Sequence, residues 1–186
     1  MKLVVLKEAN ESDWGAPSFA QHKAKTNRAI LLSNFQNLNK QLKRKPCPMP
    51  KMCEMLLNLE GFKYDLSVYL NMSYYHICLS KQASNLCTII LLWVKYRHKR
   101  LTMGLSNSPD ILQEKINKMF HSFKFIQAYI DDLLIITKGD FSNHLEKQEQ
   151  IFQKLKENGL KFNIEKSSFG KTEMEYLGFW VTRTGI

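Results

Sequence analysis

Two adjacent aspartates interrupt an apolar run in the stretch AYIDDLLIITKG, residues 128–139. Asp131 and Asp132 follow Ala128, Tyr129 and Ile130, and four aliphatic residues come directly after them. Neighbouring like charges repel, and burying even a neutral polar group without a partner costs roughly 2–7 kcal/mol. Two apolar strands joined by a tight turn would put both aspartates at the tip of a hairpin. We therefore predict a β-hairpin with the two carboxylates at its tip.

Two interpretations of the paired carboxylates are open from these residues alone. Aspartate is a good turn residue, although a tight hairpin turn more often carries Asn-Gly or Asp-Gly. Alternatively, the pair binds a divalent cation such as Mg²⁺, which prefers oxygen ligands and offsets the repulsion between the carboxylates.

The chain is strongly basic. Its 186 residues include 27 Lys plus Arg against 17 Asp plus Glu, a formal net charge of +10. This excess favours a polyanionic partner, most simply nucleic acid, and an anionic membrane surface also fits. The four cysteines lack C-x-x-C spacing, so we expect reduced thiols in an intracellular protein, cytoplasmic or nuclear. We expect neither a signal peptide nor a membrane span, because no apolar run reaches about 18 residues.

Helical and strand patterns alternate along the chain. Helices are predicted over 51–61 and 106–120, the latter with Ser108 as its N-cap, and from an Asn143–Glu146 capping pair to Gly159. Strands are predicted over 71–79, 85–96, 160–166 and 173–185. This mixture predicts an α+β domain with an antiparallel sheet.

Five blocks resemble, in order, the motifs of reverse transcriptases of the gypsy-type LTR retrotransposon branch. YIDD, residues 129–132, matches the family's Y-x-D-D motif. The other blocks are NFQNLNKQLKRKPCPMPK (34–51), LNMSYYHICL (70–79), LTMGLSNSPDILQEK (101–115) and EYLGFWVTRTGI (175–186). The chain is therefore identified as a partial and degenerate member of this family.

The resemblance implies a single domain with a right-hand polymerase fold. The palm, an antiparallel sheet backed by helices, would comprise about residues 46–76 and 108–186. Most of the fingers would comprise about residues 1–45 and 77–107, with a truncated start at Met1 and no thumb. The thumb and RNase H regions would belong to a longer ancestral polyprotein.

The resemblance also implies an activity: RNA-directed DNA synthesis, in which a primer 3′-hydroxyl attacks a dNTP on an RNA or DNA template. Two Mg²⁺ ions, with Mn²⁺ as an alternative, assist this transfer. The implied metal ligands are Asp131, Asp132, a third aspartate on a neighbouring strand and the Leu70 backbone.

Position 69 departs from the family pattern, because the third aspartate is replaced by Tyr69. A tyrosine is neutral at pH 7, its pKa being near 10. Asp65 lies four residues upstream, about 13 Å away along a strand, which is too far to bind the same ion. We therefore expect impaired polymerase activity. The alternative is a catalytically dead retrotransposon relic that at most binds nucleic acid through its basic surface.

Further site residues follow from the resemblance alone. Lys166 matches a lysine suspected of protonating pyrophosphate, and a solvated surface lysine is the alternative. The alternative for Gln113 is a structural role, and for residues 176–178 it is packing in the core. Two basic runs, residues 42–45 and 95–100, could bind template phosphates, and the alternative is that they form a solvated face. Two other positions depart from the pattern: Ile30 replaces an arginine expected to contact the triphosphate, and Ser73 replaces a glycine. The implied dNTP-binding residues are Tyr74, Met103, Gly104, Gln113, Lys23 and Arg28; the primer-binding residues are Tyr129, Tyr176, Leu177 and Gly178; the template-binding residues are Lys43, Arg44, Lys99 and Arg100.

Overall fold

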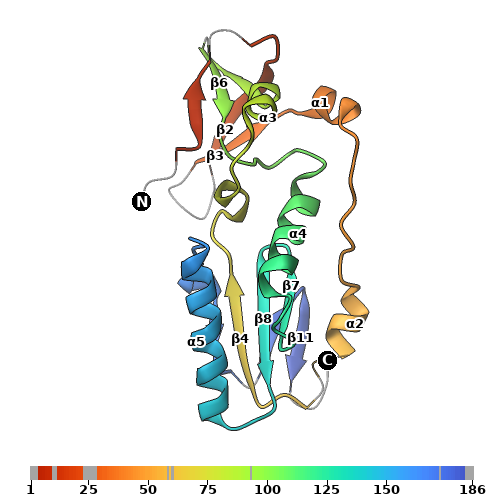
Figure 1. Cartoon of the computed structure of the whole chain (residues 1–186), viewed down its shortest axis with the longest axis vertical. Coiled ribbons are helices and arrows are strands. Elements are labelled where there is room, and N and C mark those ends of the chain that lie inside the picture. The colour runs from red at the N-terminus through yellow and green to blue at the C-terminus, as the bar shows by residue number, and fades with distance from the viewer. Residues whose placement is uncertain are drawn as a thin grey trace. The chain divides into compact units, whose positions relative to one another are not determined.

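A computed structural model describes residues 4–9, 12–22, 29–57, 59, 61–92, 94–171 and 173–182. The chain divides into two units (Figure 1). The first unit is Met1–Pro46 with Tyr74–Pro109, and the second unit is Cys47–Ser73 with Asp110–Ile186. The naming of these units as fingers and palm stays a prediction.

The first unit contains a five-stranded sheet with the strand order β1-β6-β5-β2-β3. Its neighbouring strands are antiparallel except β2 and β5, which run parallel. A core cluster that includes Phe35, Leu38 and Ile89 is buried in this unit. The elements are β1 Leu6–Glu8, β2 Ala16–His22, β3 Ala29–Ser33, α1 Gln36–Gln41, α3 Lys81–Leu86, β5 Thr88–Leu91 and β6 Val94–His98.

The second unit contains a four-stranded antiparallel sheet with the order β7-β8-β4-β9. Helix α5 lies along β4 and β8 (Figure 1), and a separate hairpin is formed by β10 and β11. The elements are α2 Met52–Leu57, β4 Tyr64–Tyr69, α4 Ser108–Phe120, β7 Ile126–Tyr129, β8 Asp132–Thr137, α5 Phe141–Glu157, the 3₁₀ turn η2 Ile164–Lys166, β9 Ser168–Phe169, β10 Glu173–Tyr176 and β11 Phe179–Thr182.

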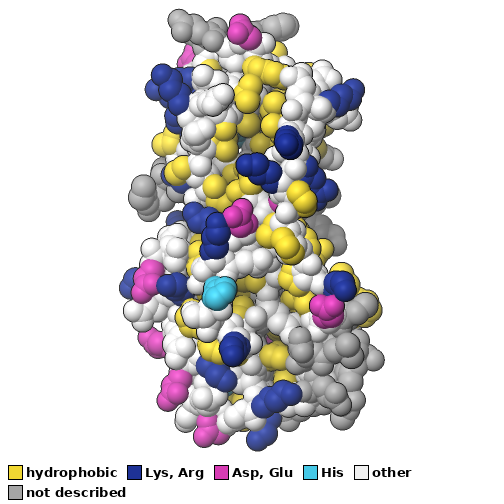
Figure 2. Space-filling model, turned by 45° about the vertical axis from the view of Figure 1, so that its right-hand side comes forward, with side chains coloured by type: hydrophobic (Ala, Val, Ile, Leu, Met, Phe, Trp, Pro, Cys, Tyr) yellow, Lys and Arg dark blue, Asp and Glu magenta, His cyan; other side chains and the backbone are white. Residues whose placement is uncertain are grey.

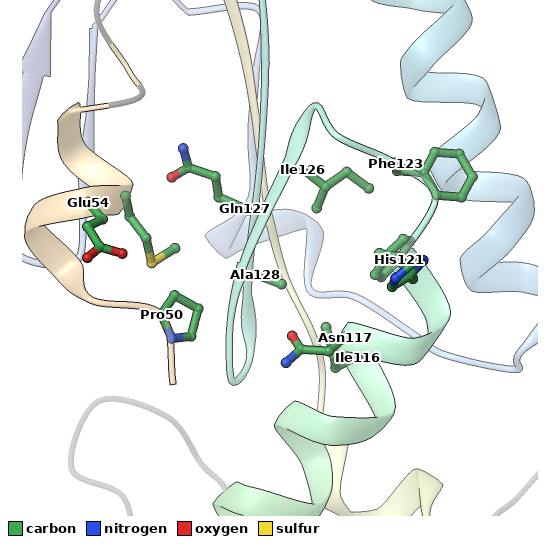
Figure 3. Close-up of a pocket in the computed structure, with 11 residues that line it drawn as sticks. Pro50, Glu54, Ile116, Asn117, His121, Phe123, Ile126, Gln127 and Ala128 are labelled. Carbon is green, nitrogen blue, oxygen red and sulfur yellow. The ribbon is translucent and has the colours of Figure 1, made fainter. Parts of the chain in front are cut away.

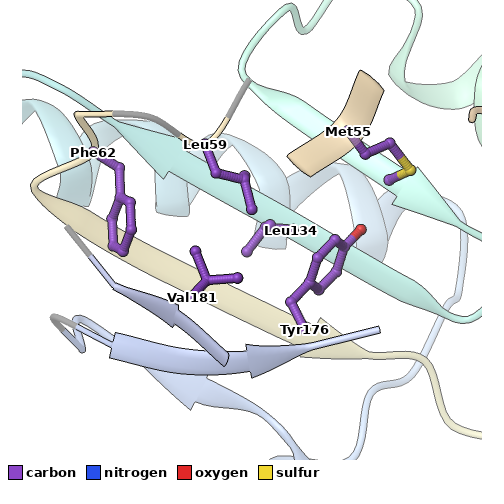
Figure 4. Close-up of a cluster of buried hydrophobic side chains, with 6 residues drawn as sticks. All are labelled: Met55, Leu59, Phe62, Leu134, Tyr176 and Val181. Carbon is purple, nitrogen blue, oxygen red and sulfur yellow. The ribbon is translucent and has the colours of Figure 1, made fainter. Parts of the chain in front are cut away.

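Apolar side chains from distant parts of the sequence hold the second unit together. Figure 4 shows a cluster in which residues of α2, residues just after it and residues of the β10–β11 hairpin converge on β8. Its members are Met55, Leu59, Phe62, Leu134, Tyr176 and Val181, none more than 4% exposed. Such burial is the dominant favourable term in folding, so this cluster fixes the sheet that carries the aspartate hairpin.

Helix α5 shows why local sequence determines where an element begins. The Asp140 side chain accepts a hydrogen bond from the Asn143 backbone N–H, which caps the helix. The predicted Asn143–Glu146 capping pair is therefore wrong, because Asp140 fills this role three residues earlier. Ile151 and Leu155 on this helix are buried, whereas Leu145 is 46% exposed. Gly159, with φ +65°, follows the helix as predicted.

Two predicted strands are wrong. Residues 71–79 contain the 3₁₀ turn η1, Ser73–His76, because Met72 has φ +51° and interrupts the extended chain. Residues 160–166 form a single bridge, from Phe162 to Leu70, and then the turn η2. In each place aromatic and aliphatic residues suggested a strand, whereas backbone turns decide the conformation.

The helices predicted over 51–61 and 106–120 exist with shorter bounds, whereas the single strands predicted over 85–96 and 173–185 are each replaced by two paired strands. Residues 85–96 contain the end of α3, the strand β5 and the start of β6, and residues 173–182 form the β10–β11 hairpin, while residues 183–185 lie outside the described residues. The helix predicted over 51–61 spans Met52–Leu57, and α4 begins at Ser108 itself rather than after it.

The three cysteines whose side chains are described are free thiols. Across the described ranges, every helix is too short or too polar to cross a membrane.

Candidate active site

The predicted aspartate hairpin is confirmed as the connection between β7 and β8. Tyr129 pairs with Asp132, so Ile130 and Asp131 form the two-residue turn and Asp132 begins the next strand. Ile130 has φ +52°, a conformation that is unfavourable for a β-branched residue. The turn therefore depends on contacts from elsewhere in the unit.

Gln113, on α4, supplies these contacts. Its Oε1 atom accepts a hydrogen bond of 2.7 Å from the Ile130 backbone N–H, and its Nε2 atom donates to the Ala128 carbonyl at 2.9 Å. The Gln113 residue is fully buried. These bonds support the structural alternative for Gln113, and a dNTP-binding role stays a prediction.

Strand β4 brings position 69 next to the hairpin. Tyr69 is the register partner of Asp132, and the Leu70 N–H donates to the Asp131 carbonyl at 2.8 Å. Side chains of directly paired residues have Cβ atoms about 4.5–5.5 Å apart. Asp65 pairs with Ile136, four residues further along the strand. The register thus confirms that residue 69, and not Asp65, lies beside the aspartates.

Burial and neighbouring groups act in opposite directions on the two hairpin carboxyls. Burial raises the pKa of Asp131, whereas a hydrogen bond from Ser73 and the charge of Lys166 lower it. For Asp132, burial and the charge of Asp131 raise the pKa, and Lys166 again lowers it. The pKa of both carboxyls is raised overall, and Ser73 and Lys166 limit the rise at Asp131 while Lys166 alone limits it at Asp132.

Ser73 is a site residue to which the motif resemblance assigned no role. Its side chain is fully buried, and its hydroxyl donates a hydrogen bond to Asp131 Oδ1. The replacement of a motif glycine by serine was a signal of an added hydrogen bond, but the partner was not evident from the sequence.

Tyr69 brings a neutral ring to this end of the sheet. Burial, followed by the charges of Asp131 and Asp132, raises the pKa of the Tyr69 phenol, so it stays protonated at neutral pH. The Lys166 ammonium lies over the ring, with Nζ 4.2 Å from the ring centroid. A cation at this distance from an aromatic face is attracted to it.

These side chains do not fit the two-ion Mg²⁺ centre that the resemblance implies. Within the described part of the chain, no three His, Cys, Asp or Glu side chains are grouped closely enough to hold a metal ion. One Asp131 oxygen already accepts from Ser73, and Tyr69 supplies no negative charge. A hard dication prefers several charged or carbonyl oxygens, so the donor set is too small.

The predicted primer-binding residues lie mainly against the core of the second unit. Tyr176 is 2% exposed, and burial raises its pKa. Leu177 and Gly178 form the two-residue turn between β10 and β11, and both have positive φ, +51° and +83°. Tyr129 and Leu177 pack against the same core cluster. These contacts support the core-packing alternative, while a role in primer binding stays a prediction.

The first unit contains the other predicted dNTP-binding residues that are described. Met103 is exposed, and the Gly104 carbonyl accepts a hydrogen bond from Asn39 Nδ2 at 2.8 Å. Gly104 has φ +89°, a conformation that favours glycine. Tyr74 packs partly buried against the core of the unit. Lys23 and Arg28 lie outside the described residues.

The predicted template-binding residues also belong to the first unit. Lys43 and Arg44 are exposed, whereas Lys99 and Arg100 are half-buried. Arg100 Nη1 donates to the His76 carbonyl at 3.5 Å, so part of its hydrogen-bonding capacity is used within the unit. Figure 2 shows Lys and Arg side chains scattered over the face in view, with apolar side chains among them. A role of these four residues in binding phosphates stays a prediction, with the solvated face as its alternative.

A cavity of about 380 Å³ opens in the second unit between α2, α4 and β7 (Figure 3). It is lined by Pro50, Glu54, Met55, Ile116, Asn117, Phe120, His121, Phe123, Ile126, Gln127 and Ala128. The predicted site residues are all absent from this lining. The cavity therefore shares strand β7 with the aspartate hairpin but does not include the hairpin turn.

The mixed α+β fold matches solved structures of foamy viral protease-reverse transcriptase. The structure in complex with an RNA/DNA hybrid aligns with a TM-score of 0.88 at 23% sequence identity, covering 97% of this chain and 24% of that chain. The structure in complex with double-stranded DNA gives a TM-score of 0.89 at 22% identity, covering 96% of this chain and 31% of that chain. At these identities the match shows the fold.

Sequence comparison shows the family. A family model described as reverse transcriptase (RNA-dependent DNA polymerase) matches residues 22–181. The retrovirus-related Pol polyprotein from transposon 412 of Drosophila melanogaster is 30% identical over 159 residues, which are 84% of this chain and 13% of that protein. The enzymatic polyprotein of Soybean chlorotic mottle virus is 26% identical over 181 residues, 95% of this chain and 26% of that protein.

The chain therefore belongs to the reverse transcriptase family and is related to retrotransposon polyproteins. It spans 13–26% of the length of these two relatives.

Proposed function

We propose that this chain is the fingers and palm part of a reverse transcriptase fold that binds a template–primer duplex and does not transfer nucleotides above background. The observation that carries the proposal is the pairing of Tyr69 with Asp132. The position at which the family has its third carboxylate holds a phenol whose pKa is raised by burial and by the two aspartates.

Electrostatics give the size of the expected loss. The hairpin retains two carboxylates, whereas the reaction in this family depends on three negative ligands around the reacting phosphates. Each 1.36 kcal/mol of lost transition-state stabilisation lowers a rate tenfold. Replacing a charged ligand by a neutral one at a partly buried site costs several kcal/mol, which corresponds to a rate lower by about 10³-fold or more.

Duplex binding does not need the third carboxylate. The net charge of +10 favours a polyanion, and basic side chains release counterions when they contact phosphates. The foamy viral relatives that share the fold are described in complex with an RNA/DNA hybrid and with double-stranded DNA. These facts support a template–primer duplex as the partner of this chain.

Fluorescence anisotropy with a labelled RNA–DNA duplex over a series of salt concentrations tests the binding part. The logarithm of the affinity should fall linearly with the logarithm of the salt concentration. Replacing Lys99 and Arg100 by Ala should reduce the slope by about 1–2 if both contact phosphates.

The matched control removes the same number of charges with Lys124→Ala and Lys138→Ala. These two exposed residues flank the end of β7 and β8 that is opposite the hairpin turn. The control should leave the slope unchanged. Equal slopes in all three proteins would return Lys99 and Arg100 to the solvated-face interpretation, and no measurable duplex affinity would contradict the proposed function.

A slow polymerase is the second candidate function. The observation that favours it is the intact hairpin, with Asp131 and Asp132 at the turn. Primer extension above background in Mg²⁺ or Mn²⁺, abolished by Asp131→Asn, would support this candidate against the duplex-binding proposal.

A further inference from the structure

The segment between α5 and β9 is tied to Tyr69 by backbone hydrogen bonds. The Asn163 N–H donates to the Tyr69 carbonyl at 2.8 Å, and the Tyr69 N–H donates to Ser167 Oγ at 3.2 Å. Ser167 Oγ in turn donates to the Asn163 carbonyl at 2.6 Å. The turn η2 lies between these anchors, so Lys166 is held beside Tyr69 although the two residues are far apart in the sequence.

The resulting arrangement gives the Lys166 ammonium two kinds of attractive neighbour. Its Nζ atom lies 4.2 Å from the centroid of the Tyr69 ring, within the range of about 6 Å over which a cation is attracted to an aromatic face. Its positive charge also acts on both hairpin carboxyls. In the described part of the chain, neither carboxylate makes an ion pair within 4.0 Å. Lys166 is therefore a nearby charge and not a direct ion-pair partner.

We propose that Tyr69 and Lys166 form a built-in cation site that balances the charge of Asp131 and Asp132 and disfavours the binding of a divalent ion. The inference rests on the proposed loss of metal-assisted nucleotidyl transfer and gives that loss a second physical cause. Tyr69 not only lacks a charge; its ring also holds a competing cation close to the carboxylates.

The competition follows from Coulomb's law. A resident ammonium repels an approaching dication and reduces the negative potential that would attract it. An aspartate at position 69 would offer no aromatic face, so the same lysine would lose this contact. The hydrogen bond from Ser73 to Asp131 has a similar consequence, because it occupies one oxygen that an ion would use.

Titration with Mn²⁺, followed by electron paramagnetic resonance of the free ion, tests the inference without any enzymatic readout. The informative variant is Lys166→Met, which removes the ammonium and keeps an unbranched apolar chain. We expect it to bind Mn²⁺ more tightly than the natural chain by about three- to tenfold, the size expected when the Coulomb repulsion from one nearby ammonium is removed.

The matched control is Lys161→Met, which removes the same charge from an exposed lysine five residues away. It should leave the Mn²⁺ affinity close to that of the natural chain, which separates a local effect from a change in net charge. Lys166→Arg keeps a cation that can stack on the ring, and Tyr69→Phe keeps the ring, so both should also leave the affinity unchanged.

Two outcomes would overturn the inference. The first is an unchanged Mn²⁺ affinity in Lys166→Met while circular dichroism shows the natural fold. The second is an equal gain in Lys161→Met. If Lys166→Met is unfolded, Lys166→Gln replaces it, with the same expected gain and the same contradicting result.

The result of the Mn²⁺ titration can be distinguished from the results that test the proposed function. Primer extension by the natural chain would contradict the proposed function even if Lys166→Met gained affinity. Conversely, duplex binding without extension would keep the proposed function, while an unchanged Mn²⁺ affinity in Lys166→Met would remove the built-in cation site.

Discussion

Each of the two units buries an ionisable side chain, and burial shifts the pKa values of the two side chains in opposite directions. In the first unit His98 is 1% exposed, and neither ring nitrogen has a hydrogen-bond partner among the described residues. In the second unit Asp65 is fully buried, and its Oδ2 atom accepts a hydrogen bond from Ser168 Oγ at 3.2 Å. Burial lowers the pKa of the histidine and raises that of the aspartate, so both groups favour the neutral form.

The aspartate hairpin differs from both. Asp131 and Asp132 are also partly buried, but Ser73 and Lys166 oppose the effect of burial. Ser168 and Lys171 oppose burial at Asp65 in the same way, and the pKa of all three carboxyls is raised. What distinguishes the hairpin is that two carboxyls lie side by side and the charge of Lys166 acts on both of them.

The largest pH effect should come from His98. Burial lowers its pKa to about 4 from an unfolded value near 6.5. Between these values the unfolded state binds more protons, so stability falls as the pH drops from 6.5 to about 4. The loss approaches about 3 kcal/mol, because one pKa unit corresponds to 1.36 kcal/mol.

Urea unfolding at pH 7 and at pH 4.5 checks this prediction. His98→Leu should lose less stability on acidification than the natural chain does. The control His121→Leu, at an exposed histidine, should behave like the natural chain. Equal acid losses in all three proteins would show that His98 does not remain neutral in the folded state.

A smaller effect of opposite sign is expected from Asp65. Its folded pKa is raised above the ordinary value, chiefly by burial, while Ser168 and Lys171 lower it and so limit the shift. The favourable contribution of the neutral carboxyl is therefore present below the unfolded pKa and is lost as the pH rises through the folded pKa. Asp65→Asn removes this dependence.

The stability difference between the natural chain and Asp65→Asn should favour the natural chain more at pH 4 than at pH 7. Thermal unfolding of the two proteins at both pH values measures it. Asp13→Asn, at an exposed position, is the matched control and should show no such trend. A difference that favours the natural chain more at pH 7 would mean that Asp65 is ionised when folded.

The sequence predicted the features that depend on local pattern or on motif order. The hairpin at Asp131, the α+β class and the position of residue 69 beside the hairpin all follow from short stretches whose spacing is constrained. The 3₁₀ turn at Ser73–His76 was missed, because the positive φ of Met72 is a tertiary effect with no glycine to mark it.

Contacts between residues that are distant in the sequence could not be predicted from it. The Ser73–Asp131 hydrogen bond joins residues 58 positions apart, and Lys166 reaches Tyr69 because the segment from Asn163 to Ser167 is tied to β4. No periodicity encodes such pairs. They arise only when the sheet of the second unit has formed.

Primer extension by the natural chain and by Tyr69→Asp, on one preformed RNA–DNA duplex with dNTPs and Mg²⁺, tests the central claim most directly. The variant restores the third carboxylate and removes the ring that holds Lys166. The account predicts that the natural chain binds the duplex and extends it only at background, while Tyr69→Asp extends it about 10³-fold faster. A further Asp131→Asn change should abolish the gain. Equal extension by the natural chain and Tyr69→Asp, at background or above it, would contradict the claim that Tyr69 disables this site.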